Sequence, residues 1–240
     1  MITLYQFPIS HYCEKARWAL EYKNIAYKTV NLLPGFHVSK ARKLAPRSEV
    51  PILTCGDQVV QGSSEIITFL DRKFPQRSLT PAGQWAEQAL HWERYVDDAL
   101  GPHVRRCCYH ILLDYPEIVI DFFSQRGPFY AKPLLRFIFP TFKKRMRTLM
   151  AINEQSAGKS MQKIDAVVDK LFSYLQVHPF LSGENFSRAD LAAAALIAPL
   201  RMPHKYGLDW PAEVPEAFAA IMRKYRDKTA WVDEVYGRYR

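Results

Sequence analysis

The sequence has few of the features that mark a secreted, membrane-spanning or metal-binding protein. Its four cysteines, Cys13, Cys55, Cys107 and Cys108, have neither the spacing of metal ligands nor that of a secreted disulfide framework. No uncharged apolar stretch reaches the length of a membrane-spanning helix. The N-terminal MITLYQF lacks a basic segment followed by an apolar run, so no secretory signal is predicted. We therefore expect a cytoplasmic protein in a reducing compartment, without a bound metal.

Motifs for phosphate loops and nucleic-acid binding are also missing. The stretch GKSMQK, from Gly158, has too little glycine and the wrong spacing for a phosphate-binding loop. The net charge of +9 favours an acidic partner, such as nucleic acid, a membrane surface or a small anion. Because no nucleic-acid motif accompanies that charge, we predict no nucleic-acid partner.

The chain divides into two parts with different patterns. Residues 1–78 alternate strand-like and helical stretches in the order β-α-β-α-β-β-α. The first crossover calls for parallel strands, whereas Gly56-Asp57 predicts a tight antiparallel hairpin. Residues 86–240 show only helical spacing, including an apolar run at 191–200 that predicts a helix buried within a bundle. The predicted fold class is an α/β domain followed by an all-α domain.

Three local signals place helix ends in this scheme. Asn24 is expected to end the first helix, and the side chain of Ser63 or Ser64 is expected to cap the last helix of the α/β part. In the second part, Ser187 and Asp190 form a reciprocal capping box. Such a box stabilises a fold and carries no chemistry.

Four stretches together resemble the cytosolic glutathione transferases over nearly the whole chain. They are SHYCEKAR from Ser10, EVPIL from Glu49, QGSSEII from Gln61 and FSRADLAAAAL from Phe186. The resemblance implies a thioredoxin-like domain at 1–78 that binds glutathione. It also implies an all-helical domain at 86–240 that holds the acceptor site, and assembly as a homodimer.

The first stretch is similar to the active-site turn of this family, with Ser10 at the position of the first cysteine of the glutaredoxin C-P-Y-C turn. The resemblance implies that the Ser10 hydroxyl stabilises the sulfur of bound glutathione, aided by the helix N-terminus. The simpler interpretation of Ser10 is a helix N-cap. Cys13 is either a second catalytic residue with a lowered pKa or a structural bystander.

The resemblance also implies the residues that hold glutathione. Val50 precedes Pro51, which is expected to follow a cis peptide bond, and pairs its backbone with the cysteinyl part. Ser64 and the helix amides receive the γ-glutamyl carboxylate. Ser63, also assigned to the glutathione site, stands where an acidic residue or glutamine is common in the family. Glu65 is either its replacement as partner of the γ-glutamyl amine or simply a favourable negative charge at the helix N-terminus.

Cations for the glycine carboxylate and residues of the acceptor site are less sharply predicted. Among the basic residues before the cis-proline, Arg47 is nearest the strand. The resemblance implies that residues from around Tyr95 to Tyr109 line the acceptor site. The basic, aromatic stretch HVRRCCYH, from His103, either favours an anionic or aromatic electrophile there or is a partly buried helix with a solvated basic edge. Residues 114–150 form an enlarged connection: a lid, an internally or dimer-packed excursion, or a surface for another protein or, less favoured, a membrane.

Three functions remain open at this stage. The favoured one is transfer of the glutathione thiol to an electrophilic small molecule, with glutathione as co-substrate. The second is glutathione-dependent thiol-disulfide exchange through Cys13. The third is a non-catalytic protein of the same fold that binds ligands or partners.

Overall fold

The N-terminal third of the chain forms a four-stranded mixed sheet flanked by helices. The computed structural model describes residues 1–240. The elements here are β1 (Ile2–Gln6), α1 (His11–Tyr22), β2 (Lys28–Asn31), α2 (His37–Leu44), β3 (Ile52–Cys55), β4 (Gln58–Gln61) and α3 (Ser63–Lys73). The strand order is β2-β1-β3-β4. The β1–β2 pair is parallel and the other two pairs are antiparallel, so the predicted topology and the hairpin at Gly56-Asp57 are confirmed.

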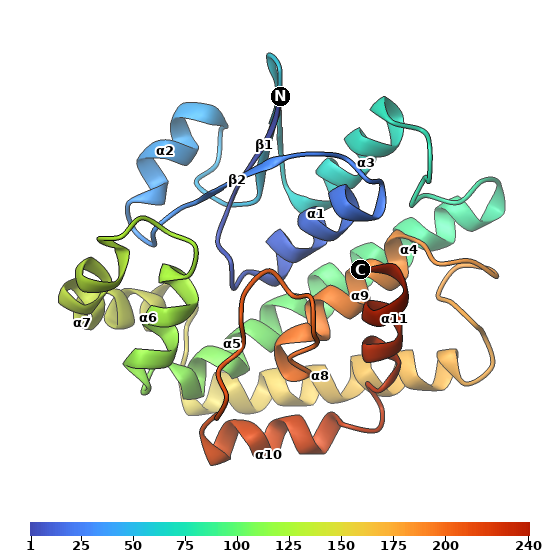
Figure 1. The fold of residues 1–240 in the computed structure, drawn as a ribbon. Coiled ribbons are helices and arrows are strands. Elements are labelled where there is room, and N and C mark those ends of the chain that lie inside the picture. The colour runs from blue at the N-terminus through green and yellow to red at the C-terminus, as the bar shows by residue number, and fades with distance from the viewer.

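Alternating burial along β1 explains how this sheet is covered. Ile2, Leu4 and Gln6 point to the buried face, where they pack with side chains of α1 and α3. Tyr5, on the opposite face, packs with α2 against Ala41 and its neighbours. Helix α1 is buried along nearly its whole length because the sheet lies on one side and the helical part of the chain on the other (Figure 1).

The remainder of the chain is helical. It comprises α4 (Gln84–Ala99), α5 (Gly101–Leu112), α6 (Pro116–Ser124), α7 (Ala131–Leu149), α8 (Glu154–Leu175), α9 (Arg188–Ile197), a short 3-10 turn at Ala198–Leu200, α10 (Glu216–Tyr225) and α11 (Trp231–Tyr239). Every residue of α9 is buried, between α1, α4, α5 and α11, which confirms the predicted buried helix. None of the helices is both long and apolar enough to cross a lipid bilayer.

The predicted helix ends are partly right. Helix α1 ends at Tyr22, and Asn24 lies just beyond it with a left-handed φ of 55°, a conformation that asparagine tolerates. The predicted side-chain cap of α3 by Ser63 or Ser64 is wrong. The N-cap is Gly62, with a φ of 107° and no side-chain hydrogen bond. The Ser64 hydroxyl is instead bonded to Asp97 of α4.

Residues 114–150 fold as the helices α6 and α7, which pack on each other beside the N-terminal part (Figure 1). The ring of Phe123 in α6 lies 5.5 Å from that of Phe7, centroid to centroid. Asn31 of β2 also donates to the carbonyl of Arg126 at 3.0 Å. The enlarged connection therefore packs against the edge of the sheet domain. Phe137 of α7 is 86% exposed, and contact of this helix with a membrane or a partner stays a prediction.

The capping box at the start of α9 is confirmed. Asp190 accepts from the backbone N–H of Ser187 at 3.0 Å and from that of Leu181 at 2.7 Å. The Ser187 hydroxyl accepts from Ala189 N–H and from the Ser182 hydroxyl. Burial raises the pKa of Asp190 to about 6, and the hydrogen bonds to its carboxylate oppose that rise. The Asp190 carboxylate thus connects the loop before α9 to α9 itself.

We expect Asp190→Ala to lower the free energy of unfolding by about 2–3 kcal/mol, because it removes a cap and leaves the buried N–H of Leu181 unpaired. Chemical denaturation measures this. Asn153→Ala, in the exposed capping box of α8, is the matched control and should cost about 1 kcal/mol. Equal losses in the two variants would contradict a special role for the buried box.

Candidate active site

Ser10 lies between β1 and α1, where the chain turns from the sheet into the helix. Its backbone is extended, and its Oγ accepts a hydrogen bond from the backbone N–H of Cys13 at 3.3 Å. The predicted N-cap is therefore confirmed. The Ser10 hydroxyl donates no hydrogen bond in the structure and is only half-buried. Capping and donation to a ligand are compatible, because the first uses the oxygen and the second uses the proton.

Cys13 lies in the first turn of α1 with no solvent exposure. Burial raises the pKa of its thiol, although the positive charge of Arg17 acts in the opposite direction. All four cysteines are free. A buried thiol with a raised pKa is a poor nucleophile, so the structure favours the bystander interpretation of Cys13.

The segment before β3 presents backbone groups without partners. The Val50–Pro51 peptide is cis, as expected. The Pro51 carbonyl accepts from Gly62 N–H at 3.0 Å, whereas the N–H and carbonyl of Val50 make no hydrogen bond. Gln61 bonds the backbone of Arg47 and Glu49 and so holds this segment in place. The Arg47 side chain is exposed and pairs with Glu49 at 3.2 Å.

Three predicted residues, Ser63, Ser64 and Glu65, lie at the start of α3, each in a different environment. Ser63 is buried, and Glu65 is exposed. The Glu65 carboxylate folds back over Gly62, where it complements the positive end of the helix. The Ser64 hydroxyl donates to Asp97 at 2.8 Å and accepts from Lys15 at 3.2 Å. Ser64 thus faces the helical domain, which sequence reasoning missed.

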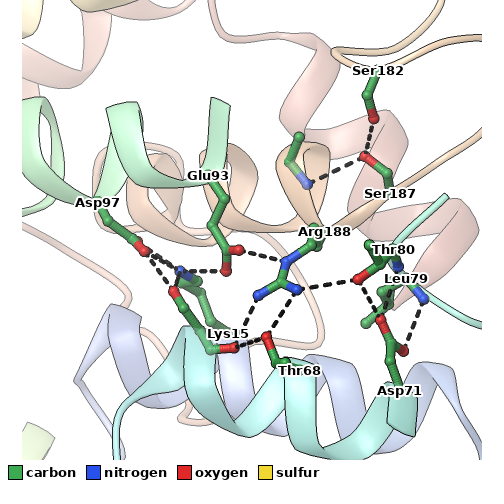
Figure 2. Close-up of polar contacts among 12 residues, drawn as sticks. Lys15, Thr68, Asp71, Leu79, Thr80, Glu93, Asp97, Ser182, Ser187 and Arg188 are labelled. Atoms are coloured by element: carbon green, nitrogen blue, oxygen red, sulfur yellow. Dashed lines mark hydrogen bonds and ion pairs between the residues drawn. The ribbon is translucent and has the colours of Figure 1, made fainter. Parts of the chain in front are cut away.

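A buried ionic cluster joins the two domains at this point (Figure 2). Lys15, fully buried in α1, contacts both carboxylate oxygens of Asp97 at 2.6 and 2.7 Å and Glu93 at 3.1 Å. Arg188 donates to Glu93 at 2.5 Å and to the Ser64 carbonyl at 2.9 Å. Burial raises the pKa of the Glu93 carboxyl, but Lys15 and Arg188 outweigh burial and hold it below its usual range. The acidic partners sit on α4, some 80 residues away, so no local pattern signalled them.

The linker between the domains is held by a second buried pair next to this cluster. Asp71 accepts from the N–H groups of Leu79 and Thr80 at 3.0 and 2.9 Å, and from Lys23 at 2.9 Å. Arg188 also reaches the hydroxyl of Thr80 at 3.1 Å. The end of α3, the linker and the start of α9 therefore form one connected network (Figure 2).

The stretch HVRRCCYH, expected in the acceptor site, lies within helix α5, and its side chains point in different directions. Arg105 is close enough to His11 of α1 for its charge to help lower the pKa of that imidazole to about 3, after burial as the larger cause. His103 and Arg106 point the other way and bond Ser160 of α8. Cys108 and Tyr109 are buried in the core. His11, whose Nε2 is buried without a partner, was not identified from the sequence.

No group of three or more histidine, cysteine, aspartate or glutamate side chains lies close enough to hold a metal ion. The candidate site contains a hydroxyl, backbone amides and carbonyls, and charged side chains. That arrangement suits a peptide-like ligand with charged ends.

Comparison with known families matches both parts of the chain. The N-terminal domain family of glutathione S-transferases matches residues 4–78, and the C-terminal domain family matches residues 128–238. The chain belongs to the glutathione S-transferase family.

Relatives of known name lie within the same family. Glutathione S-transferase 1 of Dianthus caryophyllus is 40% identical over 83 residues, which are 33% of this chain and 38% of that protein. Glutathione S-transferase Z2 of Arabidopsis thaliana is 31% identical over 118 residues, 47% of this chain and 52% of that protein. The chain thus matches about half or less of the length of these curated relatives.

Similar solved structures cover nearly the whole chain. Glutathione transferase F7 from Populus trichocarpa superposes with a TM-score of 0.66, at 16% identity over 99% of this chain and 94% of its own. The beta-etherase LigF from Sphingobium sp. strain SYK-6 gives 0.65, at 20% identity over 97% and 98%. At these identities the likeness shows the shared fold.

We expect Lys15→Met to lower the free energy of unfolding by about 3–5 kcal/mol, because it leaves the partly buried carboxylate of Asp97 without its ion-pair partner and removes one of the two cations beside the buried Glu93. Chemical denaturation measures the loss. Lys143→Met, which breaks an exposed pair with Asp114, is the control and should cost about 0–1 kcal/mol. The double variant Lys15→Met/Asp97→Leu should recover part of the stability. A Lys15→Met loss no larger than that of the control would refute the role of the cluster.

We expect Cys13 to resist alkylation in the folded protein at pH 7.5, because its thiol is buried and its pKa is raised. Peptide mass spectrometry after timed iodoacetamide treatment compares it with the half-buried Cys55. Cys13 should react only after denaturation. Modification of Cys13 at the rate of Cys55 would restore it as a candidate nucleophile.

Proposed function

We propose that this chain is a glutathione transferase that joins the sulfur of glutathione to an electrophilic small molecule. The observation that carries the proposal is the Ser10 hydroxyl, half-buried at the N-terminus of α1 with its proton not donated to any protein group. The names of the relatives and both family matches support the same activity.

In the proposed complex, glutathione lies along the segment before β3. The unpaired N–H and carbonyl of Val50 are suited to pair with the backbone of the cysteinyl residue, as an added strand would. Pro51 ends that pairing and leads into β3. The γ-glutamyl carboxylate is received by the uncapped first turn of α3, from the amides of Ser63 and Ser64.

The charged ends of glutathione have two further candidate partners. Glu65 stands at the start of α3 for the γ-glutamyl amine, and Arg47 stands before the cis-proline for the glycine carboxylate. Both side chains are exposed, so both are free to reorient toward a ligand. Their present contacts, with Gly62 and Glu49, would be exchanged for contacts with glutathione.

The chemistry then needs only stabilisation of a thiolate. A thiol with a pKa of about 8.5 is mostly protonated at neutral pH, so the site must favour the charged form. The Ser10 hydroxyl donates to the sulfur, and the amide end of α1 adds positive potential. The thiol proton leaves to solvent, and the sulfur lone pair forms the new bond to the electrophilic atom of the acceptor. The bond from that atom to its leaving group breaks, and the leaving group departs to solvent with the electron pair. No protein base is required.

The same geometry weakens the alternative that depends on Cys13. Thiol-disulfide exchange through Cys13 needs an accessible thiolate, and Cys13 is buried with a raised pKa. The activity assays described below distinguish a non-catalytic role from catalysis. Homodimerisation and an acceptor site between the two domains complete the proposal.

We expect Ser10→Ala to lower kcat/KM with glutathione and chlorodinitrobenzene about 10- to 1,000-fold, and to raise the pKa of the bound thiol. Activity assays and ultraviolet absorbance of the thiolate against pH measure the two effects. Cys13→Ser is the control with little expected change.

A second variant separates donation from capping. Glycine is nearly as good an N-cap as serine but has no hydroxyl. Ser10→Gly should therefore keep the stability of α1 and still lose activity. Normal turnover by Ser10→Gly would show that Ser10 is a cap alone. Absence of glutathione binding by calorimetry in the unaltered protein would contradict the proposal as a whole.

A further inference from the structure

A basic groove runs between α5 and α8. Its volume is about 590 Å³. The lining residues are His103 and Arg106 from α5 and Ser156, Lys159, Ser160, Gln162, Lys163 and Ala166 from α8. None of them is acidic, and none belongs to the proposed glutathione site. The groove therefore requires its own explanation.

The floor of the groove is organised around one buried hydroxyl. Ser160 has no solvent exposure. Its Oγ accepts from the guanidinium of Arg106 at 2.9 Å and bonds Nδ1 of His103 at 3.0 Å. Arg106 also donates through Nε to the carbonyl of Met150 at 3.0 Å. The guanidinium is thus held by two elements, and its second terminal nitrogen makes no hydrogen bond.

The cations of the groove have no opposite charges of their own. Arg106, Lys159 and Lys163 take part in no ion pair. Further along α8, by contrast, Asp165 and Asp169 pair with lysines of the α10 region. Burial lowers the pKa of His103, and the charges of Arg106 and Lys163 lower it further. The groove is therefore a site of unbalanced positive charge.

We propose that the groove between α5 and α8 binds a phosphorylated small molecule with two or more negative charges. The guanidinium of Arg106 is held in place and offers its unbonded terminal nitrogen as a charged donor to an oxyanion, and the two flexible lysines add point charges. The volume is within the range of small-molecule sites and exceeds what one inorganic phosphate needs. The ligand is thus an organic phosphate or a diphosphate.

The position of the groove makes this site independent of the transferase reaction. His103 and Arg106 leave α5 on the side that faces α8, whereas Arg105 acts on His11 of α1. Occupation of the groove and turnover of glutathione therefore involve different side chains. Two residues of the motif HVRRCCYH, His103 and Arg106, line the groove.

Calorimetric titration with inorganic pyrophosphate tests the proposal. The test variant is Lys159→Gln/Lys163→Gln, which removes two groove charges and leaves the Arg106–Ser160 contact intact. The control is Lys144→Gln/Arg145→Gln on α7, elsewhere on the surface, which removes two exposed charges that form no ion pair. Both variants have the same net charge, so a general effect of charge cancels.

We expect saturable binding to the unaltered protein, at least fivefold weaker binding to the Lys159/Lys163 variant, and less than twofold change in the control. Transferase activity should be the same in all three, whatever its level. No saturable heat with pyrophosphate would overturn the proposal, and so would equal weakening in both variants, which would mark a diffuse charge effect.

Discussion

The structure depends on the buried ionic cluster between the two domains. Lys15 brings a positive charge to the centre of the molecule, where it is stable only because Asp97 and Glu93 surround it. Arg188 adds a second cation, which binds Glu93 and the first turn of α3. Since an unpaired charge in this position would be costly, the sheet domain and the helical domain are held in one relative placement.

That placement sets the candidate active site. Helix α1 carries Lys15 in its body and Ser10 at its N-terminus, so holding the helix also positions the hydroxyl. Within the same cluster, the Ser64 hydroxyl donates to Asp97 and does not cap α3. The backbone amides of the first turn of α3 therefore remain free to receive an anion. The geometry of glutathione binding in our proposal is thus a consequence of interdomain packing.

Sequence patterns predicted well wherever the signal was local. The Gly56-Asp57 hairpin, the Ser10 cap and the Ser187/Asp190 box each involve residues a few positions apart, and all three are present. The α3 cap failed because Ser64 has a stronger partner in Asp97, which is 33 positions away. The residues of HVRRCCYH do not share the single site expected for them, because successive residues of a helix point about 100° apart. Its members therefore face α1, the core and α8 separately.

The sequence by itself determined the family, the order of the elements and the turn that holds Ser10, because these depend on short patterns of polarity, turn residues and caps. Only the tertiary structure decided that Cys13 is buried, that Lys15 and Arg188 are interior cations, and that His103 and Arg106 line a separate groove. The physical reason is that burial, charge pairing and cavities depend on which distant residues come into contact. Those contacts are set by the packing of α1, α4, α5, α8 and α9 against one another.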